Sequence, residues 1–357
     1  MRITKSLKAV FGILIVLVLS LVISPIPGAA AEKPIILKFS TWHPSPVTNM
    51  FANANTWILR EVEKRSKGRV KIEYYWSGSL LPAKKNLDGI KSGIADMGFV
   101  IGDYFPGKLP LTTVGGLPAI CHDYYTSAMT LKELMKMPEM KAEMDANGIV
   151  YLSHSTNISG GIWERKKVTS IADLKGQKIV VVGVKARVCQ ALGMTPVSII
   201  SSEIYPALDK GTVDGGHANP GWAGDYKWPE VAPYYFELML GSTGDMFTAM
   251  NKKSWEKLPA DIQKLFLDLQ DEAIIAGHKM YQTNAENNLK TWVANKTVFA
   301  IQPSAADVAL LEKTAKEVVW DKWVADMNKK GLPGQKVLDK WRELYKKYDA
   351  QNPFKQK

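Results

Sequence analysis

Apolar and polar positions along the chain follow the periods of strands and helices in turn. Short alternating or apolar runs predict strands, whereas apolar positions three to five residues apart, such as Trp57 and Val62, predict a helix that ends near Ser66. A shorter helix is expected around Leu87 and Ile90. The expected strands are residues 36–41, 70–75, 95–101, 149–153 and 178–182. Because strands and helices alternate, the pattern predicts an α/β fold.

Residues 87–98 and 205–216 share one pattern. Each stretch has a helix with a basic last turn, then a glycine (Gly93 or Gly211), and then a strand that carries an aspartate. A glycine at this place adopts the left-handed conformation that ends a helix. This weak repeat predicts two similar α/β lobes. Ligands of such sheets bind beyond the carboxyl ends of the strands, so two facing lobes would form a ligand cleft.

Residues 261–295 carry apolar side chains at helical spacing without a proline or a clear stop. A single helix of this length, about 50 Å at 1.5 Å per residue, exceeds the needs of one small lobe and would brace both lobes. Two helices that break near Gly277 are the alternative. A short strand at 298–301 and two final helices, at 305–328 and 335–348, are also expected.

Residues 1–31 have the three zones of a secretory signal peptide. A basic start precedes an apolar run at residues 9–23, and Ala29 and Ala31 form a small-residue cleavage site before Glu32. The apolar run is short for a membrane-spanning helix, although an uncleaved membrane anchor is the alternative. We therefore expect a protein that is exported to the periplasm and begins at Glu32.

The formal charge of +11, from 46 Lys and Arg against 35 Asp and Glu, would by itself suggest nucleic acid as a partner. An exported protein rarely meets nucleic acid. The charge therefore predicts a solvated lysine surface with a field that favours anionic ligands. A hydrophobic content of 46% excludes a disordered chain.

The sequence lacks the motifs of common catalytic and cofactor sites. It contains no zinc-protease motif, nucleophile elbow, P-loop or dinucleotide-binding glycine motif, and its five histidines do not have metal-ligand spacing. We expect no enzyme activity, no cofactor and no metal site. Cys121 and Cys189 leave two alternatives open, a disulfide or two buried free thiols.

Several motifs resemble one family along nearly the whole chain beyond residue 31. The central ones are DLKGQKI at 173–179, ALGMTPV at 191–197 and the run from Glu203 to Gly215. The segments at 61–70, 93–98 and 251–259 add to them in the same order. This set is similar to the TRAP-transporter solute-binding proteins, the DctP-like family.

The resemblance implies a two-lobed fold of the periplasmic-binding-protein type (type II-like), with a ligand cleft between the lobes that closes on binding. Lobe I would comprise residues 32–154 and 245–285, and lobe II residues 155–244 and 286–357. The resemblance also implies that the ligand passes to a membrane permease with a small and a large subunit, driven by an ion gradient.

The sequence departs from the family at the arginine that usually grips the ligand carboxylate. Val180 occupies that position, and the segment from Asn157 to Trp163, where many members carry a second arginine, contains none. Lys185 and Arg187 follow the same strand and are the candidate replacements. Arg187 is alternatively a solvated helix residue.

Side chains near the expected strand ends complete the candidate site. Aromatic side chains there favour a ligand with an aromatic or branched apolar body. The candidates are Trp42, His43, Trp76, Asp103, Tyr104, Asn157, Trp163, Lys185, Arg187, Ser201, Asn219 and Trp222. We expect capture of a small organic acid for a TRAP-type transporter. The alternatives are a binding protein for a sensor or another importer, and a hydrolase on a similar fold.

Overall fold

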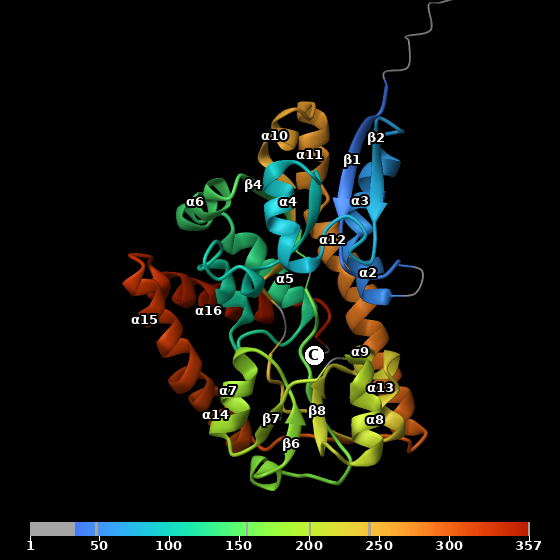
Figure 1. Ribbon diagram of the computed structural model, residues 1–357, viewed down its shortest axis with the longest axis vertical. Coiled ribbons are helices and arrows are strands. Elements are labelled where there is room, and N and C mark those ends of the chain that lie inside the picture. The colour runs from blue at the N-terminus through green and yellow to red at the C-terminus, as the bar shows by residue number, and fades with distance from the viewer. Residues whose placement is uncertain (1–32, 47–48, 155, 200, 242–243, 356–357) are drawn as a thin grey trace, which may run out of the picture. The chain divides into compact units, whose positions relative to one another are not determined.

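Two mixed β-sheets organise the chain in the computed structural model, which describes residues 33–46, 49–154, 156–199, 201–241 and 244–355 (Figure 1). The first sheet has the order β2-β1-β3-β10-β4. Its strands are β2 (Val70–Tyr75), β1 (Ile35–Ser40), β3 (Met97–Ile101), β10 (Met246–Asn251) and β4 (Ile149–His154). Strands β1 and β3 are parallel, and β10 is antiparallel to both β3 and β4. The parallel pair therefore ends at one edge of the sheet, where Trp42 and Tyr104 follow.

The second sheet has the order β11-β9-β5-β8-β6-β7. Its strands are β11 (Phe299–Ile301), β9 (Tyr234–Phe236), β5 (Gly161–Glu164), β8 (Gly215–Ala218), β6 (Lys178–Val180) and β7 (Thr195–Val197). Strand β6 is parallel to β7 and β8, whereas β5 is antiparallel to β8 and β9. The chain thus passes from the first sheet to the second after β4 and returns before β10.

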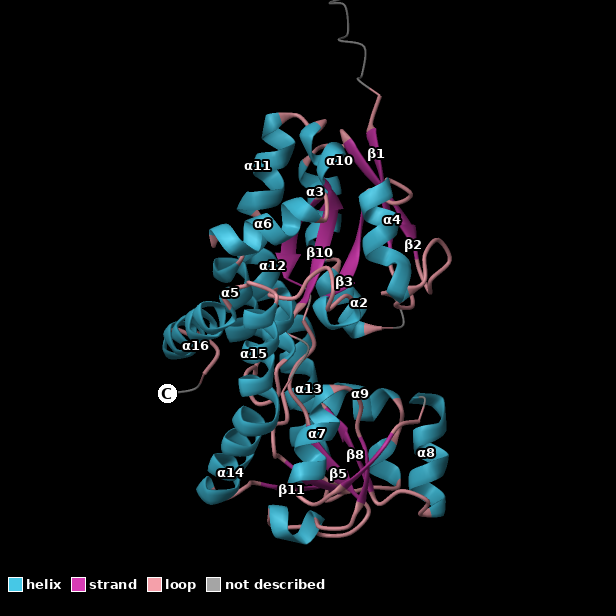
Figure 2. Cartoon of the chain, turned by 60° about the vertical axis from the view of Figure 1, so that its left-hand side comes forward, coloured by secondary structure: helices cyan, strands magenta, loops and turns pink. Residues whose placement is uncertain are grey.

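Helices cover both sheets (Figure 2). Those near the first sheet are α2 (Met50–Asn55), α3 (Trp57–Arg65), α4 (Asn86–Ser92), α5 (Tyr124–Leu134), α6 (Pro138–Ala146) and α10 (Lys252–Glu256). Those near the second are α7 (Val184–Ala191), α8 (Ser201–Lys210), α9 (Pro220–Asp225) and α14 (Ala305–Ala315). A π-helical segment, Lys316–Trp320, joins α14 to α15 (Asp321–Lys329), and the final helix α16 (Gly334–Ala350) packs on α5.

The predicted repeat is present in both sheets. Gly93 ends α4 with φ 80°, and Gly211 follows α8 with φ 73°. The aspartates of the repeat also act alike. Asp96 accepts a hydrogen bond from the Lys38 backbone N–H at 2.9 Å, and Asp214 accepts one from the Lys178 N–H at 2.8 Å. Each carboxylate therefore fastens the strand that lies beside its own.

The long helical stretch is nearly continuous. It comprises α11 (Ala260–Asp268), α12 (Gln270–Gly277), a π-helical segment (His278–Gln282) and α13 (Thr283–Ala294). Helix α12 contacts β4, α2 and α3 of the first sheet region, and α13 contacts α9 of the second. The helical stretch does not break at Gly277. The π-helical segment begins directly after this residue. The Tyr124 ring lies against Gly277, where a Cβ would come within 2.2 Å of its hydroxyl oxygen.

Burial in the hydrophobic core bears on two of the sequence expectations, the state of the two cysteines and the role of Trp163. Cys121 and Cys189 are both buried and no disulfide joins them, so the open alternative of a disulfide between them is wrong. Trp163 is fully buried, stacks on Tyr235 with ring centroids 4.5 Å apart, and donates its indole N–H to the Ala218 carbonyl at 3.1 Å. It is therefore a core residue of the second sheet, with none of its surface exposed in this structure.

Candidate functional site

Aromatic side chains gather where the parallel strands β1 and β3 end. Trp42 follows β1, and Tyr104 lies in the short 3-10 turn after β3 (Gly102–Tyr104). Their ring centroids are 5.9 Å apart, and Trp42 also packs on Phe99 of β3 at 6.4 Å. Trp42 is half-buried, and 40% of Tyr104 is exposed. These two rings therefore form a partly open aromatic surface at the carboxyl edge of the sheet.

His43 extends the aromatic cluster toward the long helix. Its ring lies 4.7 Å from Phe51 and 5.5 Å from Phe99, and Phe51 lies 5.4 Å from Tyr281 of the π-helical segment. Burial lowers the pKa of His43 to about 4, so the imidazole is neutral at pH 7. Its Nε2 is buried and has no protein hydrogen-bond partner. Neighbouring aromatic rings therefore form a continuous row from Trp42 through His43 and Phe51 to Tyr281, in the long helical stretch that contacts both sheet regions.

Asn157 and Asn219, two of the candidate residues, are brought together with Tyr281. Asn219 donates from Nδ2 to Asn157 Oδ1 at 2.9 Å, and the Tyr281 hydroxyl donates to the same oxygen at 2.6 Å. Asn219 Oδ1 accepts the Trp222 backbone N–H at 2.9 Å and so caps α9. These bonds tie the segment after β4, the end of β8 and the long helix to one another.

Charged groups from both sheet regions interact beside the aromatic surface. Asp245 is fully buried; its Oδ2 accepts the Asp103 backbone N–H at 2.7 Å, and its Oδ1 has no partner. Burial, and then repulsion from Asp103, raises the pKa of Asp245 well above its usual range. Burial of the Asp103 carboxyl also raises its pKa, and the charge of Lys185 opposes this rise. Other parts of Asp103 remain exposed. The pair therefore holds a proton more tightly than two separate carboxyls would.

Lys185 is the group of the second sheet region whose charge reaches these two carboxyls, and His217 in turn lies within reach of the charge of Lys185. Burial lowers the pKa of Lys185, and the charges of Asp103 and Asp245 oppose this shift. Burial and the charge of Lys185 lower the pKa of His217 to about 3, against a hydrogen bond with the Gly160 backbone. His217 is therefore neutral, and its buried Nε2 has no protein partner. One ammonium and two carboxyls thus share a poorly solvated region.

The other candidates have surroundings of their own. Trp76 stacks on Tyr74 with ring centroids 5.3 Å apart, Trp222 tilts against Tyr226 at 4.8 Å, and both are half-buried. Arg187 is exposed and lines a cavity of about 140 Å³ together with Asp103. The side chain of Ser201 lies outside the described residues. Val180 is buried on β6, which leaves the family's arginine position apolar.

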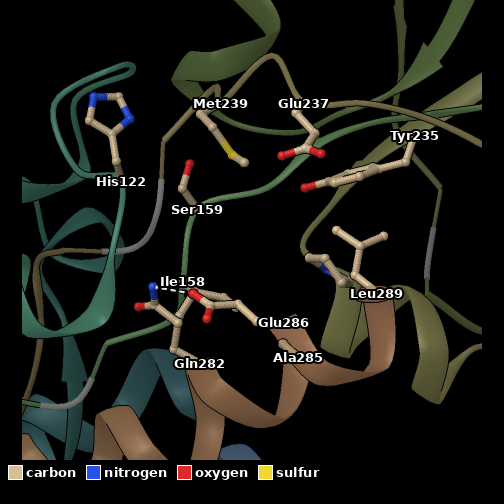
Figure 3. Close-up of a pocket in the computed structure, with 11 residues that line it drawn as sticks. His122, Ile158, Ser159, Tyr235, Glu237, Met239, Gln282, Ala285, Glu286 and Leu289 are labelled. Carbon is tan, nitrogen blue, oxygen red and sulfur yellow. Dashed lines mark hydrogen bonds between the residues drawn. The ribbon is translucent and has the colours of Figure 1, made fainter. Parts of the chain in front are cut away.

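A second cavity, of about 160 Å³, lies between α13 and the segments that join the two sheets (Figure 3). Apolar and polar side chains line it, among them Ile158, Tyr235, Glu237, Gln282 and Glu286. Gln282 donates to Glu286 Oε1 at 2.9 Å and accepts the Tyr124 backbone N–H at 2.6 Å. The cavity is smaller than the usual ligand pocket of about 300–1,000 Å³.

Sequence reasoning missed Asp245, His217 and Tyr281. Asp245 follows no motif, and only the fold brings it beside Asp103. His217 lies two residues before the candidate Asn219 on a strand whose residues alternate sides, which is the one signal that could have found it. In the part of the chain that the structure describes, no group of three potential metal ligands is present. Within the same residues, no helix has the length and apolar character that a membrane crossing requires.

Comparisons with known proteins agree on one family. The model of the bacterial extracellular solute-binding proteins, family 7, matches residues 39–330. The chain is 25% identical over 309 residues to a monocarboxylate 2-oxoacid-binding periplasmic protein of Nostoc sp., covering 85% of this chain and 82% of that protein.

Two solved structures of TRAP solute-binding proteins have the same fold. One, from Desulfovibrio salexigens, is an open complex with the C-terminus of a neighbouring molecule in its ligand-binding site; it has a TM-score of 0.82 at 26% identity and covers 90% of this chain and 98% of its own. The other, from Rhodoferax ferrireducens, contains copurified benzoate and has a TM-score of 0.72 at 25% identity, covering 89% and 99%. Their fold confirms the expected two-lobed α/β architecture.

Proposed function

Because the chain belongs to the bacterial extracellular solute-binding proteins of family 7, we propose that it captures a small organic acid with an aromatic or apolar body in the periplasm. It hands this ligand to a TRAP-type secondary transporter whose permease has a small and a large membrane subunit. It catalyses no reaction of its own.

The observation that carries this proposal is the pair of aromatic rings of Trp42 and Tyr104 at the carboxyl edge of the first sheet, near carboxyls that the charge of the half-buried Lys185 reaches. Aromatic rings favour a flat or branched apolar body, and a poorly solvated cation favours an anion. Benzoate in the Rhodoferax ferrireducens structure and 2-oxoacids for the Nostoc protein are acids with one carboxylate. Val180 leaves the family's arginine position without a bidentate partner for a carboxylate, so another cation has to hold the acid group of the ligand.

A ligand screen by thermal unfolding tests the proposal directly. A ligand that binds only the folded protein raises the melting temperature. Benzoate, mandelate and pyruvate are the probes, with succinate and galacturonate as the dicarboxylate and sugar-acid comparisons. We expect the largest shift with benzoate or mandelate. A larger shift with succinate or galacturonate would contradict the proposed ligand class.

Trp42→Ala should weaken binding of an aromatic acid about 10- to 100-fold, because a ring that stacks on the ligand contributes on the order of 1.5–3 kcal/mol. Isothermal titration with benzoate measures the change. The control is Trp255→Ala, since Trp255 is half-buried against Phe266 with ring centroids 6.1 Å apart and follows the end of β10, which pairs with the start of β3 and not with its end. Equal affinities in the two variants would remove Trp42 from the site.

We propose that ligand binding closes two lobes, lobe I of residues 32–154 and 245–285 and lobe II of residues 155–244 and 286–357. The segments after β4 and before β10 and the long helix are the connections that such a hinge would use. Small-angle X-ray scattering with saturating benzoate should show a smaller radius of gyration than without it. Identical profiles at proven saturation would argue against closure.

A further inference from the structure

Lys185 stands at an unusual place for a cation. It is the second residue of α7, which begins after Gly183 with φ 67°. The amino end of a helix carries a partial positive charge, so a lysine in the first turn is unfavourable and an anion is favourable there. Lys185 is half-buried, and its ammonium forms no hydrogen bond or ion pair with any residue the structure describes. Local helix chemistry therefore does not explain this side chain.

The two acidic residues whose charges reach Lys185, Asp103 and Asp245, belong to the first sheet region, and both pack closely on glycine backbone. A Cβ at Gly102 would lie 3.0 Å from Asp245 Oδ2, and a Cβ at Gly116 would lie 2.7 Å from Asp103 Oδ2. The two glycines thus let both carboxyl groups sit directly against the backbone. Asp245 Oδ2 accepts the Asp103 N–H, whereas its buried Oδ1 has no hydrogen-bond partner in the described part of the chain.

The remaining groups around Lys185 do not neutralise it. His217 on β8 and the thiols Cys121 and Cys189 are buried or half-buried groups that its charge reaches. Tyr104 faces the same two carboxyls. Arg187, two residues farther along α7, is exposed and shares its cavity with Lys322 and Asp326 as well as Asp103. Arg187 therefore already lies among other charged groups at the surface.

We propose that Lys185, and not Arg187, is the anchor for the ligand's carboxylate, and that Asp103 and Asp245 supply its counter-charge while the site is empty. This proposal rests on the proposed function, because it assumes an acidic ligand. An ammonium is a compact point charge that can hold one carboxylate oxygen without the planar match that arginine requires. The amino end of α7 adds favourable N–H groups for the same anion. Lys185 thus takes the role that Val180 cannot fill.

Isothermal titration of the protein purified from the periplasm separates the two candidate cations. The probes are benzoate and (R)-mandelate, each with its uncharged amide, and the variants are Lys185→Met, Lys185→Arg and the matched control Arg187→Met. We expect Lys185→Met to lose at least 100-fold in affinity for the acid, Lys185→Arg to stay within 10-fold, and Arg187→Met to stay within threefold. The amides should not bind the unaltered protein measurably. Thermal unfolding without ligand shows whether Lys185→Met is folded, and Lys185→Gln replaces it if it is not.

The outcomes distinguish this proposal from the proposed function. If the unaltered protein binds the acids and Lys185→Met binds them within threefold as well, the anchor is wrong and the function stands. A 100-fold loss in Arg187→Met alone would assign the role to Arg187. If the unaltered protein binds the amides but not the acids, both proposals fall.

Asp103→Asn tests the counter-charge: we expect a 3- to 10-fold gain in affinity for the acid, and a loss of more than threefold would overturn that part of the proposal.

Discussion

Glu164→Gln is expected to raise the free energy of unfolding by about 2–4 kcal/mol at pH 8 and to leave it nearly unchanged at pH 4. Glu164 lies on β5 with 0% of its surface exposed, and neither carboxyl oxygen has a hydrogen-bond partner among the residues that the structure describes. A Cβ at Gly215 would lie 2.5 Å from its Oε1, which shows how tightly the neighbouring strand encloses it. Burial, and then the charge of Asp214, raises the pKa of Glu164 to about 8.

The direction of the pH dependence follows from this raised pKa. Between about pH 4.5 and pH 8 the folded protein keeps the proton of Glu164 and the unfolded chain has lost it. Stability from this group is therefore complete below about pH 4.5, falls as the pH rises, and levels off above pH 8. Glutamine resembles the protonated acid in shape and does not titrate, so it removes this loss.

Urea unfolding at pH 5, 6.5 and 8 measures the effect for the unaltered protein and for Glu164→Gln. The difference between the two should grow with pH. Glu256→Gln is the control, because Glu256 is exposed on α10, and its curve should follow that of the unaltered protein. Parallel pH profiles for Glu164→Gln and the unaltered protein would show that Glu164 is ionised in the folded state at neutral pH.

The repeat was predictable because it depends on local backbone chemistry. Gly93 and Gly211 end their helices in the left-handed conformation, and such endings can be read from a glycine that follows an apolar period. The further correspondence, in which Asp96 and Asp214 each accept an N–H from the neighbouring parallel strand, depends on strand pairing. No local pattern contains that information.

Helix continuity was only partly predictable. Apolar spacing indicated the stretch from residue 261 to 295 and the final helices, but it did not distinguish α-helical from π-helical turns at His278–Gln282 and Lys316–Trp320. The single helix expected to end near Ser66 is divided at Thr56, whose hydroxyl donates to the Ala52 carbonyl at 2.7 Å. Helices α5 and α6 were not predicted. Several apolar residues of α5 are buried with polar Thr126, Ser127 and Thr130, which weakens the amphipathic pattern.

The candidate site shows a similar division. Trp42 and Tyr104 could be placed because residues after parallel strands meet at one edge. Trp163 misled the sequence argument, since an aromatic residue near a strand looks the same whether its ring faces a cleft or the core. The difference between Lys185 and Arg187 also needed the fold, because it depends on Asp245, which is 60 residues from Lys185 in the chain.

Asn219→Ala should lower the free energy of unfolding by about 2–4 kcal/mol. The substitution removes the cap of α9, a loss of about 1 kcal/mol. It also removes the Nδ2 donor to Asn157 Oδ1 from a site where Asn219 is only 4% exposed, and a broken buried hydrogen bond costs about 1–3 kcal/mol. Urea unfolding at pH 7 measures the loss. A cost below 0.5 kcal/mol would mean that water restores these bonds.

Tyr281→Phe is the milder matched change in the same network. It keeps the ring contact with Phe51 and removes only the hydroxyl, and Asn157 Oδ1 retains Asn219 Nδ2 and the Ile158 N–H at 3.0 Å. We expect a cost of about 1 kcal/mol. The stronger test is the pair Asn157→Ala and Asn219→Ala. Their side chains bond to each other, so the double variant should lose about 1–2 kcal/mol less than the sum of the single losses. Additive losses would show that Asn157 and Asn219 stabilise their elements separately, and that the long helix is not joined to β8 through this network.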